Sequence, residues 1–204
     1  MDQTFGLLTQ LYEFGSESIQ LVVPDPEQVK LAYRVTNGND KPYWTAVWPS
    51  AEAICRFLVE HPWLVSGREV WEPGAGLALP SMLAARYASL VRCSDIYQPA
   101  VDCMQASAIL NGAVNIIAER ADWNQLPPIT AEVVLLSDVH YEPGEFESVF
   151  QMIQGFLDAG ASIILGSPAR ITSSVFYDRI KGNVKKQVEY QVRLTTVSVL
   201  VLSR

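Results

Sequence analysis

From residue 50 onward the hydrophobic positions alternate between short β-branched runs and longer segments of helical periodicity. Residues 133–136 form a continuous apolar run, which is typical of a strand buried on both faces of a parallel sheet. The strands are expected at 69–71, 90–94, 114–118, 133–136 and 161–165, and the helices from Ser50 to His61-Pro62 and at 79–86, 99–110, 146–157 and 173–180. This alternation predicts an α/β fold with a doubly wound sheet and right-handed crossovers.

The two ends of the chain follow a period of two instead. Residues 184–192 and 195–202 alternate around a short turn and predict a C-terminal antiparallel hairpin, which brings the expected sheet to seven mostly parallel strands. Residues 19–23 and 29–35 read as two strands separated by Pro24-Asp25-Pro26. We therefore expect a single domain over 1–204, with a small β appendage at 1–46 and the cofactor-binding core at 47–204.

Composition narrows the class of protein. The 204 residues are 49% hydrophobic, enough to bury a full core, and no apolar run reaches the ~18 residues needed to span a bilayer. A net charge of −7 argues against a nucleic-acid partner, because that affinity depends on clustered Lys and Arg. The N-terminus lacks a basic leader, and the three cysteines show no C-x-x-C spacing. We expect a cytoplasmic protein with reduced thiols, no bound metal and no membrane partner.

The most informative motif is the glycine turn Glu72-Pro73-Gly74-Ala75-Gly76, which follows the first core strand. Glycines let the backbone approach a ligand, and Asp95, at the end of the next strand, can accept two hydrogen bonds from ribose hydroxyls. Leu79 occupies the third position of the phosphate-binding pattern G-x-G-x-x-G, which argues against a pyrophosphate. The turn is typical of an S-adenosylmethionine site, with a ligand-free tight turn as the alternative.

An aromatic cluster precedes the first core helix. Tyr43, Trp44 and Trp48 can form a lid that excludes water from a cofactor and contacts a cationic sulfonium through its ring faces. Trp48, nearest the helix start, is the preferred lid residue. The alternative is a packed aromatic plug between the β appendage and the core.

Two further motifs follow later strands. Asp122 and Trp123 can flank an adenine by hydrogen bonding and stacking, or form a plain surface loop. Asp138 and Tyr141 follow the fourth core strand, so Asp138 is expected in the same crevice as the glycine turn, unless it caps the next helix. His140 is interpreted as an outward loop residue, and neither histidine has hydrolase or metal-ligand spacing.

In order and spacing, these motifs resemble the seven-β-strand lysine methyltransferases often called methyltransferase family 16, in particular the electron-transfer flavoprotein β-subunit lysine methyltransferases and their bacterial relatives. The resemblance covers about residues 42–170. It implies a Rossmann-like class I methyltransferase fold, S-adenosylmethionine as cofactor, and a protein substrate with an accessible lysine. It assigns cofactor binding to Trp48, Glu72, Gly74, Gly76, Asp95, Asp122 and Trp123, and places Asp138 and Tyr141 near the target amine.

Other functions stay open at this point. A nicotinamide-dependent oxidoreductase would also use Asp95 for its ribose, although the missing third glycine and the closing hairpin count against it. A cofactor-binding protein without turnover is the other alternative. The methyl acceptor can be a protein lysine, another protein nitrogen or a small molecule. Ala78 departs from the family, in which a glycine is common at that position.

Overall fold

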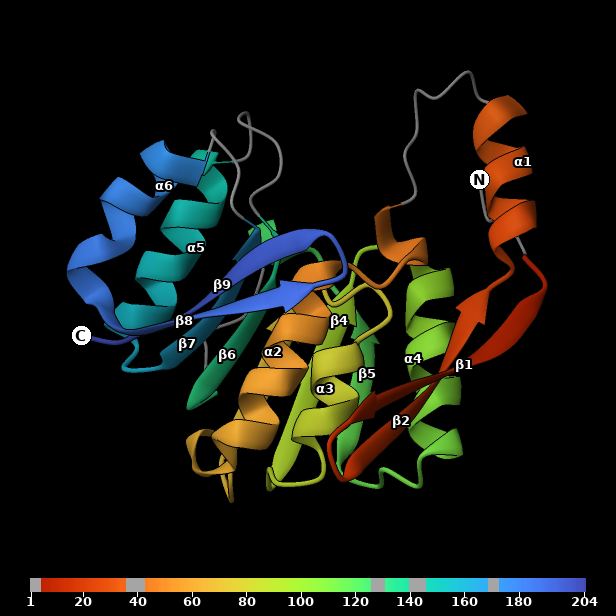
Figure 1. Ribbon diagram of the computed structural model, residues 1–204, viewed down its shortest axis with the longest axis horizontal. Helices are drawn as coiled ribbons and strands as arrows, with labels where there is room; N and C mark the ends of the chain where they lie inside the picture. The colour runs from red at the N-terminus through yellow and green to blue at the C-terminus, as the bar shows by residue number, and fades with distance from the viewer. Residues whose placement is uncertain (1–4, 36–42, 126–130, 140–145, 169–172) are drawn as a thin grey trace.

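The computed structural model describes residues 5–35, 43–125, 131–139, 146–168 and 173–204 (Figure 1). Its main sheet has seven strands in the order β5-β4-β3-β6-β7-β9-β8. The strands are β3 (Glu69–Pro73), β4 (Leu90–Asp95), β5 (Ile116–Arg120), β6 (Val133–Ser137), β7 (Ser162–Pro168), β8 (Val184–Val192) and β9 (Thr195–Leu202). The first five are parallel, and β9 runs antiparallel to both of its neighbours. The expected doubly wound sheet with a C-terminal hairpin is confirmed.

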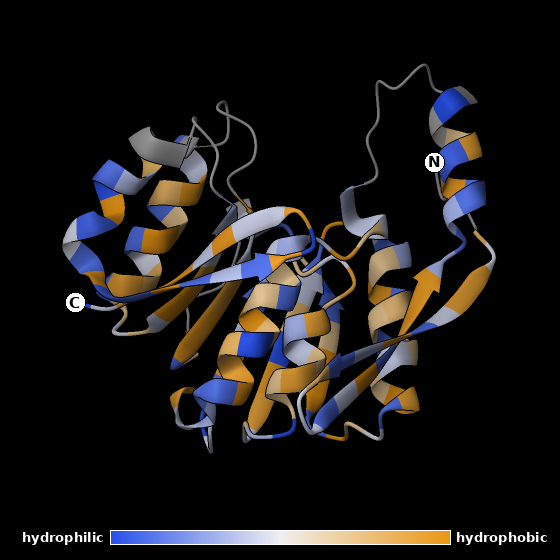
Figure 2. Cartoon of the chain, viewed as in Figure 1, coloured by the Kyte–Doolittle hydropathy of each residue, from blue (hydrophilic) through white to orange (hydrophobic). Residues whose placement is uncertain are grey.

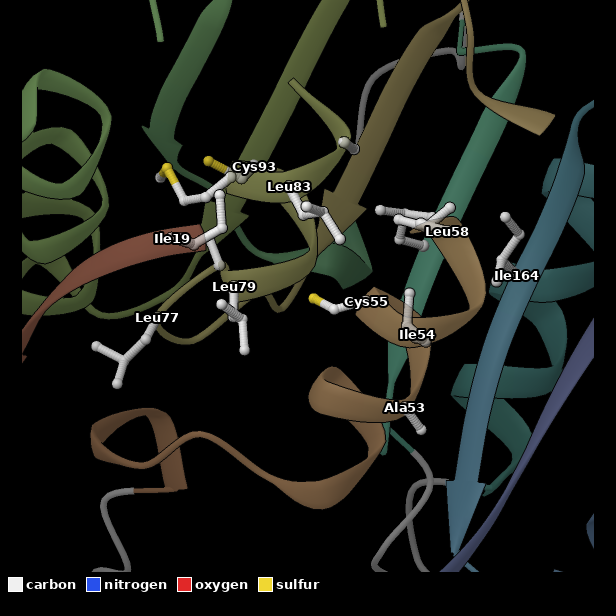
Figure 3. Close-up of a cluster of buried hydrophobic side chains, with 14 of the residues drawn as sticks. Ile19, Ala53, Ile54, Cys55, Leu58, Leu77, Leu79, Leu83, Cys93 and Ile164 are labelled. Atoms are coloured by element: carbon white, nitrogen blue, oxygen red, sulfur yellow. The ribbon is translucent and has the colours of Figure 1, made fainter. Parts of the chain in front are cut away.

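Helices cover both faces of this sheet, because its central strands are apolar on both sides (Figure 2). One face packs against α2 (Pro49–Glu60), α3 (Leu79–Ala84) and α4 (Gln98–Leu110), and the other against α5 (Phe146–Asp158) and α6 (Ser173–Ile180). Figure 3 shows part of the first cluster, with Ile54 and Leu58 of α2, Leu83 of α3 and Ile164 of β7. Along β6, Val133 and Leu135 belong to this cluster, and Val134 and Leu136 to the other.

The N-terminal region forms a separate two-stranded antiparallel sheet of β1 (Leu7–Phe14) and β2 (Glu17–Pro24). β2 lies on α4, where the Ser107 hydroxyl accepts a hydrogen bond from the Val22 N–H at 2.9 Å. The Asn111 side chain accepts from the Gln20 N–H at 3.0 Å and donates to the Gln20 carbonyl at 2.6 Å. Side chains of α4 thus satisfy backbone groups on the outer edge of β2.

The strand predicted at 29–35 is wrong, since this segment belongs to helix α1 (Pro26–Val35). Asp25 accepts a hydrogen bond from the Glu27 N–H at 2.9 Å, and Pro26 opens the helix, where its missing N–H has no consequence. The chain also contains a strand that the sequence pattern did not indicate, β1, because most of its side chains are exposed and show no clean alternation.

Several predicted boundaries also shift, among them the starts of α2 and β5. Ser50 does not cap α2, because Trp48 is the N-cap residue, Pro49 follows it, and Ser50 is fully buried in the first turn. β5 begins at Ile116 instead of residue 114, whose valine side chain is 98% exposed. Cys55, Cys93 and Cys103 are free and buried. Within the described residues, none of the helices is long and apolar enough to cross a bilayer.

Candidate functional site

The glycine turn lies at the switch point of the sheet, after the end of β3 and between the ends of β4 and β6. Gly74, Gly76 and Ala78 all adopt left-handed backbone conformations, with φ of 64°, 56° and 56°. A Cβ atom at Gly76 would lie 3.5 Å from the backbone of Trp44 in the 3₁₀ turn Tyr43–Thr45. The missing Cβ atom at Gly76 thus lets the Trp44 backbone pack close to the turn.

Asp95 braces this turn from the end of β4. One carboxylate oxygen accepts a hydrogen bond from the Gly76 N–H at 3.0 Å, and the other accepts one from the Tyr97 N–H at 3.0 Å. Burial raises the pKa of Asp95, against the lowering effect of these backbone bonds. A carboxylate has about four acceptor positions, so Asp95 can accept a further hydrogen bond, and its contact with the ribose stays a prediction. The acid assigned to the ribose therefore also holds the turn in shape.

Glu72 faces the protein interior, and its side chain is only 1% exposed. One carboxylate oxygen accepts hydrogen bonds from the Ser81 N–H at 3.0 Å and the Ser81 hydroxyl at 2.6 Å. The other accepts a bond from the Ser137 hydroxyl at 3.2 Å. Burial raises the pKa of Glu72 to about 7, although these bonds oppose the shift. Direct contact between Glu72 and the cofactor stays a prediction.

Trp44 and Trp48, the two tryptophans of the aromatic cluster, differ in their exposure to solvent. Trp44 is buried and packs against Phe5, with ring centroids 6.2 Å apart, so it is a packed plug residue. Trp48 is 37% exposed, and its indole N–H donates to the Tyr43 carbonyl at 2.9 Å. Trp48 is thus exposed at the start of α2, with its ring 6.0 Å from that of Tyr43, and its role as a lid stays a prediction.

Trp123 lies directly against the glycine turn. A Cβ atom at Gly74 would lie 2.7 Å from Cζ3 of the Trp123 indole, so the ring rests on the glycine backbone. Asp122 precedes this ring and is half-buried. The backbone bond from the Ala121 N–H to the Asp95 carbonyl, at 3.0 Å, ties the segment to the end of β4. The structure thus brings Trp123 against the glycine turn, and contact of Asp122 and Trp123 with an adenine stays a prediction.

Asp138 follows β6 on the other side of the turn and is buried. Its φ is 57°, a left-handed conformation that is uncommon outside glycine, and its N–H donates to the Gly166 carbonyl at 3.1 Å. Strained backbone of this kind clusters at functional sites. Tyr141 and His140 lie outside the described residues, so the pairing of Asp138 with Tyr141 stays a prediction.

Three contributors to this region were missed by the sequence analysis. Ser81 and Ser137 donate hydrogen bonds to the Glu72 carboxylate. Gly166 packs against the start of α2, because a Cβ atom added to it would lie 2.9 Å from the Ser50 carbonyl oxygen. No sequence signal marks either serine as a partner of Glu72. Gly166 lies within the apolar strand β7, and a glycine inside a strand is the one hint of a close backbone approach.

Comparison with known proteins supplies the family. The model of the lysine methyltransferase family matches residues 28–183. Histone-arginine methyltransferase METTL23 of Mus musculus is 28% identical over 175 residues, covering 81% of this chain and 67% of that protein. The electron transfer flavoprotein beta subunit lysine methyltransferase of Danio rerio is 29% identical over 140 residues, covering 63% and 51%. The chain thus spans about half the length of the latter relative.

Solved structures share the fold at low sequence identity. Magnesium protoporphyrin IX methyltransferase from Synechocystis PCC 6803 with bound S-adenosylhomocysteine has a TM-score of 0.61 and 16% identity, covering 88% of this chain and 100% of that one. A putative S-adenosylmethionine-dependent methyltransferase from Streptococcus mutans has a TM-score of 0.65 and 13% identity, covering 95% and 55%.

These findings confirm the predicted Rossmann-like methyltransferase fold and S-adenosylmethionine as the cofactor, and they do not favour the nicotinamide alternative. The match covers more than half of the chain and includes the glycine turn, Asp95 and Asp138. This chain belongs to the lysine methyltransferase family.

Proposed function

We propose that the protein transfers a methyl group from S-adenosylmethionine to a protein nitrogen, with a lysine side chain as the acceptor. One observation carries this proposal. The glycine turn, which lacks the third glycine of a phosphate-binding loop and is held by Asp95, follows β3, and the buried Asp138 follows the neighbouring strand β6. The names of the relatives support a protein substrate, since they describe a histone-arginine and a flavoprotein lysine methyltransferase.

The cofactor fits the residues present at the turn. The left-handed Gly74 and Gly76 carry no Cβ atoms, so Trp123 and the Trp44 backbone pack close to the turn, and Asp95 accepts a hydrogen bond from the Gly76 N–H. Asp122 and Trp123 would contact the adenine, and Trp48 would cover the sulfonium with its indole face. When bound, S-adenosylmethionine supplies the electrophilic methyl group.

Asp138 is the residue that meets the methyl acceptor. An in-line methyl transfer needs a neutral amine, so the incoming ammonium must be oriented and then lose a proton. The Asp138 carboxylate attracts and orients the ammonium, while the partly desolvated crevice lowers the amine pKa and lets water take the proton. Tyr141 would hold the remaining donor of the nitrogen. Orienting the reactants in this way can contribute up to ~7–11 kcal/mol.

A lysine is favoured over an arginine by this chemistry. A guanidinium keeps its proton at all ordinary pH values, whereas a lysine ammonium loses one readily when desolvated. The absence of nucleic-acid and membrane partners and the cytoplasmic location stay predictions from the sequence.

The test follows a radiolabelled methyl group from S-adenosylmethionine into a lysate, with mass spectrometry of the labelled residues. Asp138→Asn should then lower the methylation rate by roughly tenfold or more, equivalent to at least ~1.4 kcal/mol, and leave S-adenosylhomocysteine affinity unchanged. Equal losses of rate and affinity would move Asp138 to the cofactor side. Cofactor binding without any labelled product would favour a binding protein without turnover.

A further inference from the structure

A single buried carboxylate connects three elements of the site. Glu72 lies in β3, two residues before Gly74, and its oxygens accept hydrogen bonds from Ser81 in the first turn of α3 and from Ser137, the last residue of β6. The three bond lengths are 3.0, 2.6 and 3.2 Å. A buried charge is stable only when such bonds compensate for its lost hydration.

The Glu72 side chain points into the protein interior. Glu72 is 1% exposed, and both of its oxygens are engaged by protein donors. Asp95, by contrast, faces the turn itself through the Gly76 N–H. The hydrogen bonds described above for Glu72 thus all come from protein groups.

The bond to Ser137 reaches the acceptor side of the site. Ser137 directly precedes Asp138, whose left-handed backbone, with φ of 57°, costs about 1–3 kcal/mol and persists only where its surroundings fix it. Two of the bonds at this point are the one from the Ser137 hydroxyl to Glu72 and the one from the Asp138 N–H to the Gly166 carbonyl. Loss of the first weakens the hold on Asp138.

We propose that Glu72 is a positioning residue that acts through Ser137: it fixes the end of β6 against the cofactor turn, and this sets the orientation of Asp138. Neither Glu72 nor Ser137 touches the cofactor or the acceptor. This inference rests on the proposed function, because it takes Asp138 as the residue that meets the acceptor amine.

The chain offers variants that separate charge from hydrogen bonding. In Glu72→Gln the amide oxygen can accept both Ser81 bonds and the amide NH₂ can donate to the Ser137 hydroxyl, so the bonds survive while the charge is lost. Ser137→Ala removes only the link to β6, and Ser137→Thr restores a hydroxyl. Ser162→Ala is the matched control, because Ser162 begins β7 and pairs with Val133, at the end of β6 away from Ser137.

The measurements are S-adenosylhomocysteine affinity, kcat, and hydrogen exchange of the Asp138 amide, all at pH 8, where Glu72 is charged. Glu72→Gln should bind S-adenosylhomocysteine within roughly threefold of the native protein, far less than the loss expected when a charged ligand contact is removed. Ser137→Ala should keep that affinity, lower kcat by roughly tenfold, and speed exchange of the Asp138 amide by a similar factor. Ser137→Thr should recover both quantities, and Ser162→Ala should match the native protein.

Two results would overturn the inference. A tenfold or greater loss of S-adenosylhomocysteine affinity in Glu72→Gln would make Glu72 a direct cofactor ligand. Unchanged exchange of the Asp138 amide in Ser137→Ala would show that the link does not hold Asp138. Both readouts are independent of turnover. A failed methylation assay with the expected exchange result would therefore count against the proposed function and not against this positioning role.

Discussion

Replacing Asp95 with alanine should weaken both the fold and cofactor binding. The carboxylate accepts bonds from the N–H groups of Gly76 and Tyr97, each at 3.0 Å, so the variant leaves two backbone donors without their charged acceptor. Each donor left without its acceptor costs about 1–2 kcal/mol after water recovers part of the bond, so the free energy of unfolding should fall by roughly 2–4 kcal/mol. A domain with a typical free energy of unfolding of about 5–15 kcal/mol stays folded at 25 °C after such a loss.

Thermal melts without ligand measure this first effect. For a chain of this size, about 2–4 °C per kcal/mol gives a fall in Tm of roughly 4–16 °C for Asp95→Ala. Asp95→Asn should lose about half as much, because its amide oxygen still accepts one of the two bonds. Asp102→Ala is the matched control, since Asp102 is exposed on α4 and bonds only to the Gln98 side chain in the structure described.

Calorimetry with S-adenosylhomocysteine measures the second effect. Affinity should fall by more than tenfold, because the variant loses the ribose acceptor and also the brace of the glycine turn. A Tm equal to that of Asp102→Ala would refute the brace. A lowered Tm with unchanged affinity would show that Asp95 shapes the turn without binding the ribose.

Four other perturbations test the surroundings. Gly74→Ala places a Cβ 2.7 Å from Cζ3 of Trp123 at a φ of +64°, so it should displace the indole and lower S-adenosylhomocysteine affinity at least tenfold. Tryptophan fluorescence and calorimetry measure these two effects, and an emission spectrum equal to that of the native protein would contradict the first. Gly166→Ala places a Cβ 2.9 Å from the Ser50 carbonyl oxygen and should cost about 1–3 kcal/mol in urea unfolding, whereas Gly155→Ala, with nothing within 4 Å, should stabilise α5 by about 0.5–1 kcal/mol. The buried Glu72, whose pKa rises from its ordinary 4.5 to about 7, takes up a proton on folding between these values. Its contribution to stability is therefore greatest below pH 4.5 and is lost as pH rises through about 7, by on the order of 3 kcal/mol; parallel pH profiles for native protein and Glu72→Gln would refute it.

Much of the site could be predicted because local pattern and topology agree there. The strand, glycine turn, helix and Asp95 follow one another at fixed spacing, and parallel strands must bring their carboxyl ends together. The C-terminal hairpin was predicted with its observed bounds, 184–192 and 195–202, because both strands alternate cleanly. Chain topology then places Asp138 beside the turn without further information.

Other features depend on contacts that sequence does not display. Residues 29, 31, 33 and 35 are apolar or aromatic at period two, which indicated a strand, but the Asp25-Pro26 start signal and the tertiary setting gave a helix. The inward direction of Glu72 follows from strand parity, since Val70 faces the cluster of α2 and α3 while Trp71 faces the opposite one. Its partner Ser81 could not be inferred, because the register of α3 depends on the left-handed Ala78.

The attachment of β2 to α4 has a consequence for the order in which the protein assembles. The hydrogen bonds of β2 with Ser107 and Asn111 join residues that are 85 and 91 positions apart in the chain. The chain must therefore close long loops before β1 and β2 can pack on α4. Ile19, Leu21 and Val23 nevertheless belong to the main buried cluster. We therefore expect β1 and β2 to dock late in folding, after α4 is in place, and to detach first under stress. Their loss would uncover apolar surface, so this end of the chain governs how readily the protein aggregates when partly unfolded.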